Sequence, residues 1–412
     1  SSLVGSEMCI RDRMETLLQA GVNDADLLIA MTGADELNLL CSMTAHGINP
    51  NIHTIARICN PDYTDQVYKM QKTFSLSLTV NPEKQAAIEI ERLLKFPGFL
   101  KRDSFAKGRV EIVELRVDER SRLCNVALSE MNRVIKCRVL VCAVLRRGDV
   151  VAPDGSFVLR EGDRIFVTAS TESLATLLDN LGIITKKVNH VMICGGGRVS
   201  YYLAQQLEKD GMTVRLIEKD PKHCEELAAL LPKTEIINDD ASNTFVLKRE
   251  NLESCDALVT ATGMDELNMI ISLYGTKHGV SQVITKLGHM ENGSMIDQLP
   301  IGSTIWPKDL CCNGIVRYIR AMHNQTGAAV SVHSIADGKA EAIEFHVEEK
   351  KPYCDKPLKN MKVKQNILVA CITHGGVTEL PGGDSVIREG DTVVVVTTRN
   401  DIIYKLDDIF EA

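Results

Sequence analysis

One segment of this chain occurs twice, and the repeat restricts what the chain can fold into. The segment DLLIAMTGADELN at residues 26–38 reappears as DALVTATGMDELN at residues 256–268. In a second pair, LREGDRIFV at 159–167 recurs as IREGDTVVV at 387–395. The two copies of this pair are separated by nearly the same number of residues as the two copies of the first pair. Repeats of this length indicate one structural module used twice. The sequence therefore predicts two modules, each with a large part followed by a small part.

Residues 186–325, the large part of the second module, alternate short apolar runs with segments of helical periodicity. This alternation predicts an α/β fold, a Rossmann-like doubly wound parallel sheet with helices on both faces. A helix is expected from Pro307 to Met322, because proline suits a first helical turn. The expected strands are residues 188–194, 214–217, 235–237, 257–261, 282–285 and 303–305.

The small parts, residues 99–185 and 326–412, contain short strands and glycine turns, which predict small α+β domains. The first large part, residues 14–98, repeats the second only from its fourth strand onward. Its sheet is therefore predicted to be truncated, with a hydrophobic edge from which we expect poor expression. Residues 1–13 match neither the repeat nor a signal peptide, and we interpret them as a non-native segment.

Composition excludes several classes of protein. The 47 basic against 55 acidic residues give a net charge of −8, which argues against a nucleic-acid surface. The 13 cysteines are scattered on apolar stretches without a Cys-x-x-Cys spacing, so we expect buried, reduced cytosolic thiols and no zinc site. No apolar run approaches the roughly 18–20 residues of a membrane-spanning helix, so a soluble protein is expected.

A glycine-rich turn supplies the clearest chemical signal. Gly195-x-Gly197-x-x-Ser200 follows an expected strand directly and opens an expected helix. The first glycine permits the tight turn, and the second lets the backbone approach a pyrophosphate at the helix N-terminus. Ser200 stands where glycine or alanine is usual, and its oxygen would loosen the packing slightly. Glu218, at the end of the next strand, suits ribose hydroxyls and repels a 2′-phosphate, which favours NAD(H) or an adenine nucleotide over NADP.

Alternatives to these assignments remain open. The glycine turn could be a packing feature without a ligand. Asp240 and Ala241 follow the third strand, where an adenine ring would lie, but Asp240 could equally cap the next helix. Thr262 and Gly263 border the crevice after the fourth strand. The acids of the following DELN segment (residues 265–268) match an ordinary helix N-terminus.

No catalytic constellation accompanies the glycine turn. The ten histidines are scattered, and the sequence lacks a Ser-His-Asp arrangement, a G-x-S-x-G motif and a Walker motif. A dehydrogenase needs a proton donor and an anion clamp beside the nicotinamide, and the small domains show neither. We therefore expect no catalytic residue and no metal site. A nucleotide site without visible chemistry indicates sensing.

The chain resembles the TrkA family, the peripheral regulatory subunits of bacterial Trk potassium uptake systems, built from tandem regulator of potassium conductance (RCK) modules. The resemblance is carried by the order of the four domains, by GGGRVS at 195–200, by IARICNPDY at 55–63, and by the NPE and FPG motifs at 81–83 and 96–98. The first module lacks the glycine motif and the ribose acid, so no nucleotide site is assigned there.

The resemblance implies a function and a set of partners. The chain would form a homo-oligomer, a dimer or a tetrameric ring, on the cytoplasmic face of the plasma membrane. This homo-oligomer would bind NAD(H), or else ATP or ADP. That ring would gate an integral-membrane potassium-translocating subunit of the TrkH/TrkG type. The segment 96–98 and the preceding helix would form the crossover by which modules pair. The residues implied in nucleotide binding are Gly195, Gly197, Arg198, Val199, Ser200, Glu218, Asp240, Ala241, Thr262 and Gly263.

The roles of two cations and two alternative functions of the chain also remain open. Arg57 and its counterpart Lys286 could contact phosphate, lie at a module interface, or be solvated charges at strand ends. The alternative functions are an NAD-dependent oxidoreductase and a regulator of another cation channel or antiporter.

Overall fold

The computed structural model describes residues 14–71, 73–95, 99–105, 109–118, 121–181, 187–288, 296, 299–322, 329–336, 338–398 and 403–411. The chain forms two compact parts. The first contains the chain up to Ala87 together with Pro307–Tyr318, and the second contains Ile88–Trp306 and Ile319–Ala412. Residues 1–13, which we interpret as non-native, lie outside the described residues.

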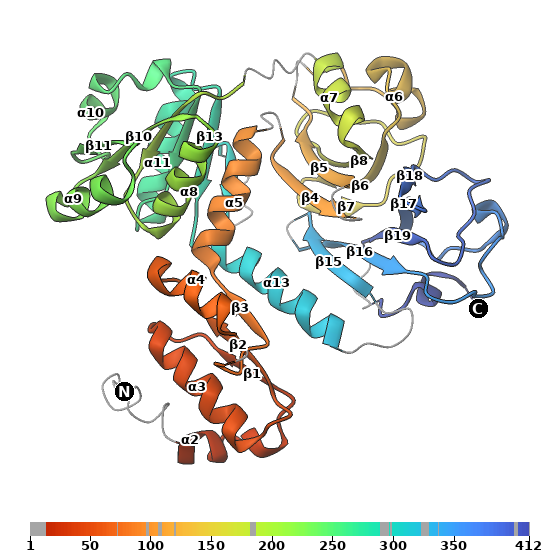
Figure 1. Ribbon diagram of the computed structural model, residues 1–412. Coiled ribbons are helices and arrows are strands. Elements are labelled where there is room, and N and C mark those ends of the chain that lie inside the picture. The colour runs from red at the N-terminus through yellow and green to blue at the C-terminus, as the bar shows by residue number, and fades with distance from the viewer. Residues whose placement is uncertain are drawn as a thin grey trace. The chain divides into compact units, whose positions relative to one another are not determined.

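A six-stranded parallel sheet forms the large domain of the second module (Figure 1). Its strands are β9 (His190–Cys194), β10 (Thr213–Glu218), β11 (Glu235–Asn238), β12 (Ala257–Thr260), β13 (Gln282–Lys286) and β14 (Ser303–Ile305). The helices are α8 (Arg198–Lys209), α9 (Pro221–Leu230), α10 (Thr244–Arg249), α11 (Asp265–Lys277) and α13 (Pro307–Met322).

The strand order is β11-β10-β9-β12-β13-β14, with every neighbouring pair parallel. This is the doubly wound order, and the predicted fold class is confirmed. All four residues of β12 are buried, because a central parallel strand is covered on both faces. The order of the strands reverses between β9 and β12, so their carboxyl ends border a crevice.

The first module has a three-stranded parallel sheet in the order β1-β2-β3. Leu27 of the first strand lies opposite His53, just as Ala257 lies opposite Gln282, so these strands correspond to β12, β13 and β14. Within the described residues the first strand is an edge, and its Ile29 side chain is 42% exposed. The elements are α2 (Met14–Gln19), β1 (Leu27–Ala30), α3 (Asp35–Ile48), β2 (His53–Arg57), α4 (Pro61–Lys69), β3 (Leu78–Val80) and α5 (Pro82–Lys95).

The duplicated sequence segment corresponds to a duplicated hydrogen-bond network. In the second module the buried Asn268 side chain accepts hydrogen bonds from the backbone N–H and the hydroxyl of Thr262, both at 2.8 Å. Its Nδ2 donates to the carbonyl of Lys286 at 3.0 Å. Asn38 makes the same contacts with Thr32 and Arg57 in the first module. The asparagine therefore joins the ends of two neighbouring strands, which explains why the repeat preserves it.

Helices α5 and α13 each begin in the first part of the chain and end in the second. The carbonyl of Leu93 on α5 accepts a hydrogen bond from Gln282 Nε2 of β13 at 2.7 Å. Tyr318 Oη on α13 lies 2.9 Å from His53 Nδ1 of β2. Each long helix therefore contacts the first residue of a strand that belongs to the other module. Residues 96–98, expected in the crossover, lie outside the described residues.

The two small domains share one antiparallel topology, with sheet orders β4-β5-β8-β6-β7 and β15-β16-β19-β17-β18. The first consists of β4 (Lys101–Phe105), β5 (Val110–Arg116), α6 (Leu128–Ile135), β6 (Leu140–Arg146), β7 (Asp149–Val151), β8 (Arg164–Ser170) and α7 (Thr171–Asn180). The second consists of β15 (Ala329–Ile335), β16 (Ala340–His346), β17 (Ile367–His374), β18 (Val377–Glu379) and β19 (Thr392–Thr397).

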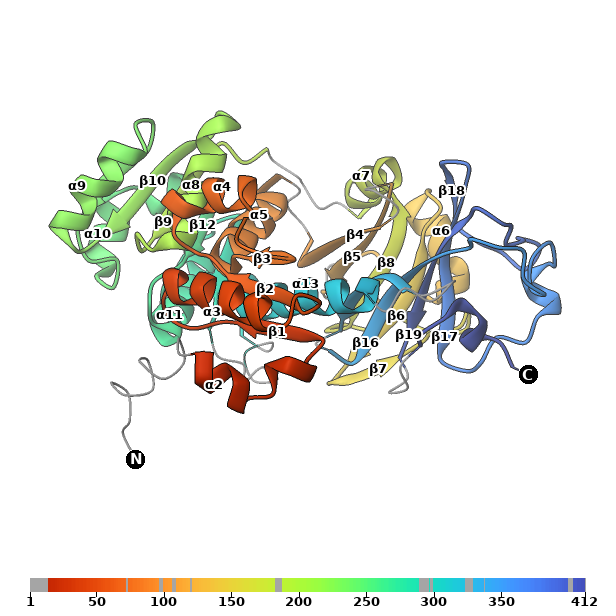
Figure 2. The ribbon, with the colours of Figure 1, turned by 60° about the horizontal axis from the view of Figure 1, so that its bottom comes forward.

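One hydrophobic core joins the small domains, whose sheets lie beside each other in Figure 2. Phe166 of β8 and Ala143 of β6 pack in the same cluster as Ala342 of β16 and Val394 of β19. All four are at most 1% exposed. The inner faces of the two sheets therefore bury each other, which explains the small alanine side chains at this contact.

The repeated REGD segments form matching turns. Gly162 and Gly390 have φ angles of 85° and 84°, in the left-handed region that favours glycine. The carboxylate of Asp163 accepts a hydrogen bond from the backbone N–H of Arg160 at 2.7 Å.

The cysteines depart from one expectation. The described cysteines are free thiols, and most are buried as expected. Cys312 is exposed, however, and Cys124 and Cys137 are half-buried. The prediction of burial was wrong for these three, because Cys312 lies on an outer face of α13 and the other two border the core of the first small domain.

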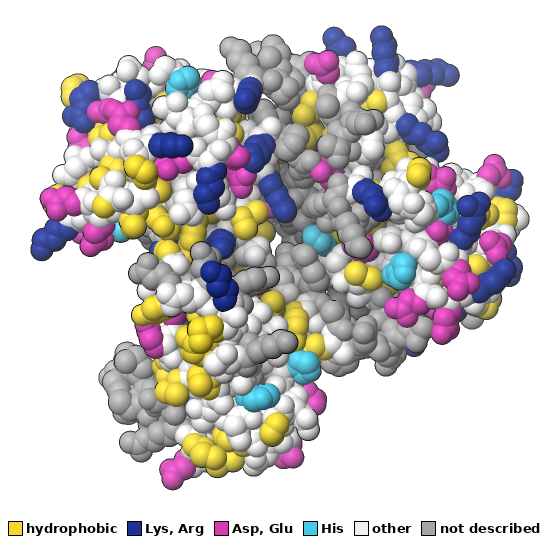
Figure 3. All heavy atoms as spheres, in the orientation of Figure 1, with side chains coloured by type: hydrophobic (Ala, Val, Ile, Leu, Met, Phe, Trp, Pro, Cys, Tyr) yellow, Lys and Arg dark blue, Asp and Glu magenta, His cyan; other side chains and the backbone are white. Residues whose placement is uncertain are grey.

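On the face visible in Figure 3, basic side chains are interspersed with acidic ones. Among the described residues, no helix is both long enough and apolar enough to cross a membrane.

Candidate functional site

The glycine turn lies at the carboxyl end of β9, beside the end of β12. Gly195 has a φ of 98°, and its N–H donates to the carbonyl of Ile217 at 2.8 Å. A Cβ added to Gly195 would lie 2.8 Å from Thr262 Cα. Both the left-handed backbone and the close approach of a neighbouring strand therefore require glycine here.

Gly197 has a different role in the same turn. It is the N-cap of α8 with a φ of −64°, and a Cβ there would meet only the carbonyl oxygen of Ala261, at 4.0 Å. Space is therefore left in front of the first backbone N–H groups of α8, which have no partner within the helix. Such a helix start can accept a phosphate.

Glu218 contacts the turn directly from the end of β10. Its Oε2 accepts a hydrogen bond from the N–H of Gly196 at 2.7 Å, and its Oε1 accepts one from the N–H of Asp220 at 2.9 Å. A Cβ on Gly196 would lie 3.0 Å from this carboxylate and 2.8 Å from Leu227 Cδ1. The middle glycine, which the sequence motif leaves free, therefore lies against the acid and Leu227, and a larger residue here would have to displace these side chains. Each carboxylate oxygen retains acceptor capacity for a ribose hydroxyl.

His223, in the first turn of α9, also contacts the glycine turn, and we did not single it out from the sequence. Its Nε2 lies 2.9 Å from the carbonyl oxygen of Gly196, and its Nδ1 lies 3.0 Å from Glu226 Oε2. The hydrogen bond with Glu226 raises the pKa of His223 above its ordinary value, while partial burial opposes the rise. Nothing in the spacing of the motif indicates this contact, because it depends on how α9 packs beside the turn.

The residues that follow the glycines differ in exposure. Arg198 opens α8 and is exposed, whereas the Val199 side chain is 4% exposed and offers only its backbone to a ligand. Ser200 is fully buried, and its hydroxyl has no hydrogen-bond partner among the described residues. A buried hydroxyl in this state destabilises the domain.

Asp240 and Ala241 follow β11. The Asp240 carboxylate accepts a hydrogen bond from the backbone N–H of Ser242 at 2.8 Å, and this bond is the main cause of its lowered pKa. Asn243, not Asp240, is the N-cap of α10, and its side chain accepts from Phe245 N–H at 3.0 Å. The alternative prediction that Asp240 caps this helix was therefore wrong, because the turn places the cap three residues later.

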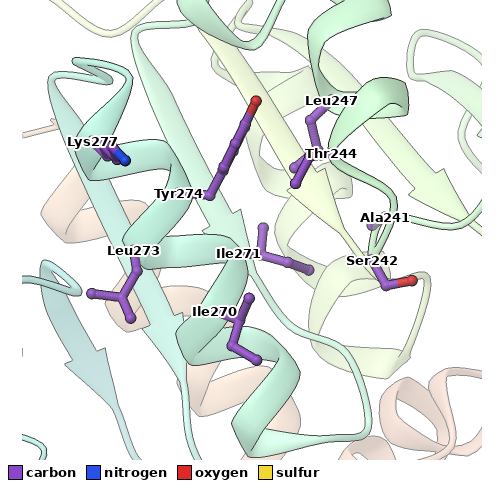
Figure 4. A pocket seen from close by; sticks show the side chains of 9 residues that line it. All are labelled: Ala241, Ser242, Thr244, Leu247, Ile270, Ile271, Leu273, Tyr274 and Lys277. Carbon is purple, nitrogen blue, oxygen red and sulfur yellow. The ribbon is translucent and has the colours of Figure 1, made fainter.

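Ala241 lines a cavity of about 250 Å³ between the start of α10 and one face of α11 (Figure 4). The Tyr274 hydroxyl in its wall is buried and has no hydrogen-bond partner among the described residues. The cavity is mostly apolar and adjoins the position expected for an adenine ring. Its lining residues are Ala241, Ser242, Thr244, Leu247, Ile270, Ile271, Leu273, Tyr274 and Lys277.

Thr262 and Gly263 lie at the carboxyl end of β12, across from the glycine turn. Thr262 is held by Asn268, and Gly263 is exposed with open space around its Cα. Lys286 Nζ donates to the carbonyl of Thr262 at 2.9 Å, and Arg57 makes the equivalent contact with Thr32 at 3.3 Å. Both cations therefore bind the backbone at the ends of their own sheets.

Asp265 also has a structural contact. Its two carboxylate oxygens each lie 2.9 Å from the N–H of Gly288, beyond the end of β13. In the first module, a single oxygen of Asp35, Oδ2, accepts from the backbone N–H groups of Cys59 and Asn60. The acid at the start of the helix therefore tethers the loop after the next strand, in addition to suiting a helix N-terminus.

No group of three or more histidine, cysteine, aspartate or glutamate side chains suited to a metal ion occurs in the part of the chain that the structure describes. The site instead combines backbone N–H groups, one carboxylate and an apolar cavity. These groups can bind and orient a nucleotide.

Two domain families match most of the chain. The TrkA-N domain matches residues 11–76 and 191–307, and the TrkA-C domain matches residues 112–182 and 342–410. Each large part therefore contains a TrkA-N match, and each small part contains a TrkA-C match.

Curated relatives match nearly the whole chain. A Trk system potassium uptake protein TrkA homolog of Archaeoglobus fulgidus is 29% identical over 96% of this chain and 88% of its own length. TrkA homolog 1 of Methanosarcina mazei is 28% identical over 92% of this chain and 85% of its own. TrkA of Haemophilus influenzae is 27% identical over 96% of this chain and 87% of its own length.

Solved structures share the fold at low identity. The GsuK RCK domain has a TM-score of 0.59 at 14% identity, covering 94% of this chain and 81% of that chain. The GsuK channel bound to NAD has a TM-score of 0.56 at 14% identity, covering 94% of this chain and 67% of that chain. Domain matches, relatives and fold agree, and this chain belongs to the TrkA family.

Proposed function

We propose that this chain is the nucleotide-binding regulatory subunit of a Trk-type potassium uptake system. The observation that carries the proposal is the glycine turn with its acid: Gly195 and Gly197 open α8, and Glu218 contacts the turn from the neighbouring strand. This arrangement occurs in a TrkA-N domain, and the relatives are named Trk system potassium uptake proteins.

The ligand is an adenine dinucleotide or mononucleotide. The N–H groups at the start of α8 would receive the pyrophosphate, with Arg198 as the adjoining exposed cation. Glu218 would accept hydrogen bonds from the ribose hydroxyls, and its charge disfavours a 2′-phosphate. Thr262 and Gly263 would border the phosphates from the other side of the crevice. A structural relative of similar fold, the GsuK channel, has been solved with NAD bound, which supports NAD(H) as first choice over ATP or ADP.

The adenine ring would lie at the cavity beside Asp240 and Ala241. The apolar side chains of α11, such as Ile270 and Ile271, suit the faces of the ring. The buried Tyr274 hydroxyl has no hydrogen-bond partner among the described residues, and a ring nitrogen would supply one. Buried polar groups are normally hydrogen-bonded, so the site has a group suited to this ligand.

Regulation follows from differential affinity. A nucleotide can change the state of a transporter only to the extent that it binds one conformation of the regulatory subunit more tightly than another. The crevice is formed by turns from separate strands, so a ligand across it would favour one spacing of those turns. The partner would be an integral-membrane potassium-translocating subunit of the TrkH/TrkG type. The chain would act as a homo-oligomer on the cytoplasmic face of the membrane, without catalysing a reaction.

The test is calorimetric titration of the whole chain with NAD, NADH, ATP and ADP, together with a turnover assay for NADH oxidation against a metabolite panel. Binding without turnover supports the regulatory function and ranks the ligands. Turnover would replace it with the oxidoreductase alternative. Absence of binding to all four nucleotides would refute the nucleotide site.

A further inference from the structure

Both backbone polar groups of Gly196 are held by side chains. Its N–H donates to Glu218 at 2.7 Å, and its carbonyl oxygen lies 2.9 Å from His223 Nε2. Since a carbonyl oxygen can only accept, Nε2 must carry the proton in this contact. The orientation of the glycine turn therefore depends on β10 through the acid and on α9 through the histidine.

The second ring nitrogen restricts the protonation state. His223 Nδ1 lies 3.0 Å from Glu226 Oε2, and an ionised carboxylate also only accepts. Both contacts can be hydrogen bonds at once only when both ring nitrogens carry protons. The observed geometry is thus that of the imidazolium ion, with the charge beside the turn.

The groups around the ring favour the positive charge. Glu226 on α9 and Glu218 on β10 both raise the pKa of His223, Glu226 more strongly. Asp220, the N-cap of α9, lies in the same turn and accepts from the backbone N–H of His223 at 3.5 Å. The neighbouring cations Arg198 and Lys222 are exposed. The His223 side chain is 38% exposed, so solvent screens this charge in part.

We propose that His223 is a positioning residue of the nucleotide site, and that its imidazolium form holds the glycine turn in the orientation that receives the nucleotide. The inference rests on the proposed function and adds a regulatory property to it. When the ring loses its Nδ1 proton, the lone pair faces Glu226 and the positive charge beside the pyrophosphate position disappears. Nucleotide affinity is therefore full while His223 is protonated, and falls as pH rises through the pKa of this residue.

The experiment measures NAD binding to the whole chain by calorimetry between about pH 5.5 and 8.5, a range that brackets the ordinary histidine pKa of about 6.5. NAD is the probe because its pyrophosphate diester keeps its charge over this range. We expect the dissociation constant to rise about two- to fivefold across the range, the size of a partly screened charge interaction. In H223Q, whose amide can still donate to Gly196, the dissociation constant should be independent of pH.

His190 provides a matched control. Its Nδ1 also lies near a carboxylate, Asp256 Oδ2 at 3.5 Å, but it is the first residue of β9, at the opposite end of that strand from the glycine turn. H190Q should keep the pH dependence of the unmodified chain. The same dependence in H223Q would overturn the proposal, and so would loss of the dependence in H190Q.

A second readout separates this proposal from the proposed function. The ring NMR signals of His223 should titrate with a pKa above the ordinary histidine value, and E226Q should lower that pKa. If NAD binds at no pH, the proposed function fails, while the ring titration still tests the contact. A His223 pKa at or below the ordinary value, or one that E226Q leaves unchanged, overturns the inference.

Discussion

Gly195 and Gly197 belong to one motif, yet the structure predicts that the same substitution lowers the stability of the protein at Gly195 and not at Gly197. In Gly195→Ala, the left-handed φ costs about 1–2 kcal/mol for an L-residue. The new Cβ would lie 2.8 Å from Thr262 Cα, and moving the backbone costs about 1–3 kcal/mol more. Alanine also lowers the conformational entropy of the unfolded chain, which offsets the loss of stability by about 0.4–1 kcal/mol. We expect a net loss of about 1–5 kcal/mol, with a central value of about 3 kcal/mol.

For Gly197→Ala the contributions nearly cancel. The φ of −64° suits any residue, and the nearest atom to the new Cβ is 4.0 Å away. Alanine is a poorer N-cap than glycine by a few tenths of a kcal/mol to about 1 kcal/mol, and the unfolded-state gain offsets this loss. Stability should therefore change by less than about 0.5 kcal/mol. Nucleotide affinity should fall sharply, because the methyl group enters the space left for the pyrophosphate.

The assay uses the single tryptophan of the chain. Trp306 follows β14 and packs with Leu287 and Ile301, so its fluorescence during urea unfolding reports on the second large domain. With the central loss of about 3 kcal/mol and a slope of about 1–3 kcal/mol per molar urea, Gly195→Ala should lower the midpoint by roughly 1–3 M, and Gly197→Ala should leave it unchanged. For the unfolding midpoint alone, Gly263→Ala is the control, because no atom lies within 4 Å of a Cβ added there. Equal midpoints for the two motif variants would refute the steric argument, and unaltered NAD affinity in Gly197→Ala would refute the role of the open space.

Three further substitutions test other contacts. Ser200→Ala removes a buried hydroxyl without a partner among the described residues, and should raise the free energy of unfolding in the Trp306 assay by about 1 kcal/mol; a loss of stability would show that the hydroxyl is satisfied. Asn268→Ala leaves Thr262 N–H and the Lys286 carbonyl without their partner and should cost about 3 kcal/mol, whereas the equivalent Asn38→Ala should not shift the Trp306 transition. Glu218→Ala should weaken NAD binding by about 1–3 kcal/mol in calorimetry, through the lost ribose hydrogen bonds, and an unchanged affinity would remove this acid from the site.

Much of the architecture follows from local sequence patterns. Apolar runs of strand length that alternate with helical periodicity determined the parallel sheet, and the predicted limits of β14 and α13 agree with the observed ones. The repeat determined that two modules exist, because similar sequences make similar local contacts. The predicted crevice residues from Gly195 to Gly263 follow the ends of β9 to β12, since the strand order fixes which ends are adjacent. Their role in nucleotide binding stays a prediction.

Other features depend on contacts between segments far apart in the chain. Three results come from packing: Glu218 binds the N–H of Gly196, His223 contacts the carbonyl of the same residue, and Asn243 caps α10 instead of Asp240. The exchange of α5 and α13 between the modules is also a result of packing. A residue pattern records whether a side chain prefers burial or a helix, but not which of many distant partners it will meet. That choice is made only when the elements pack, because each hydrogen bond then depends on the positions of two separate parts of the chain.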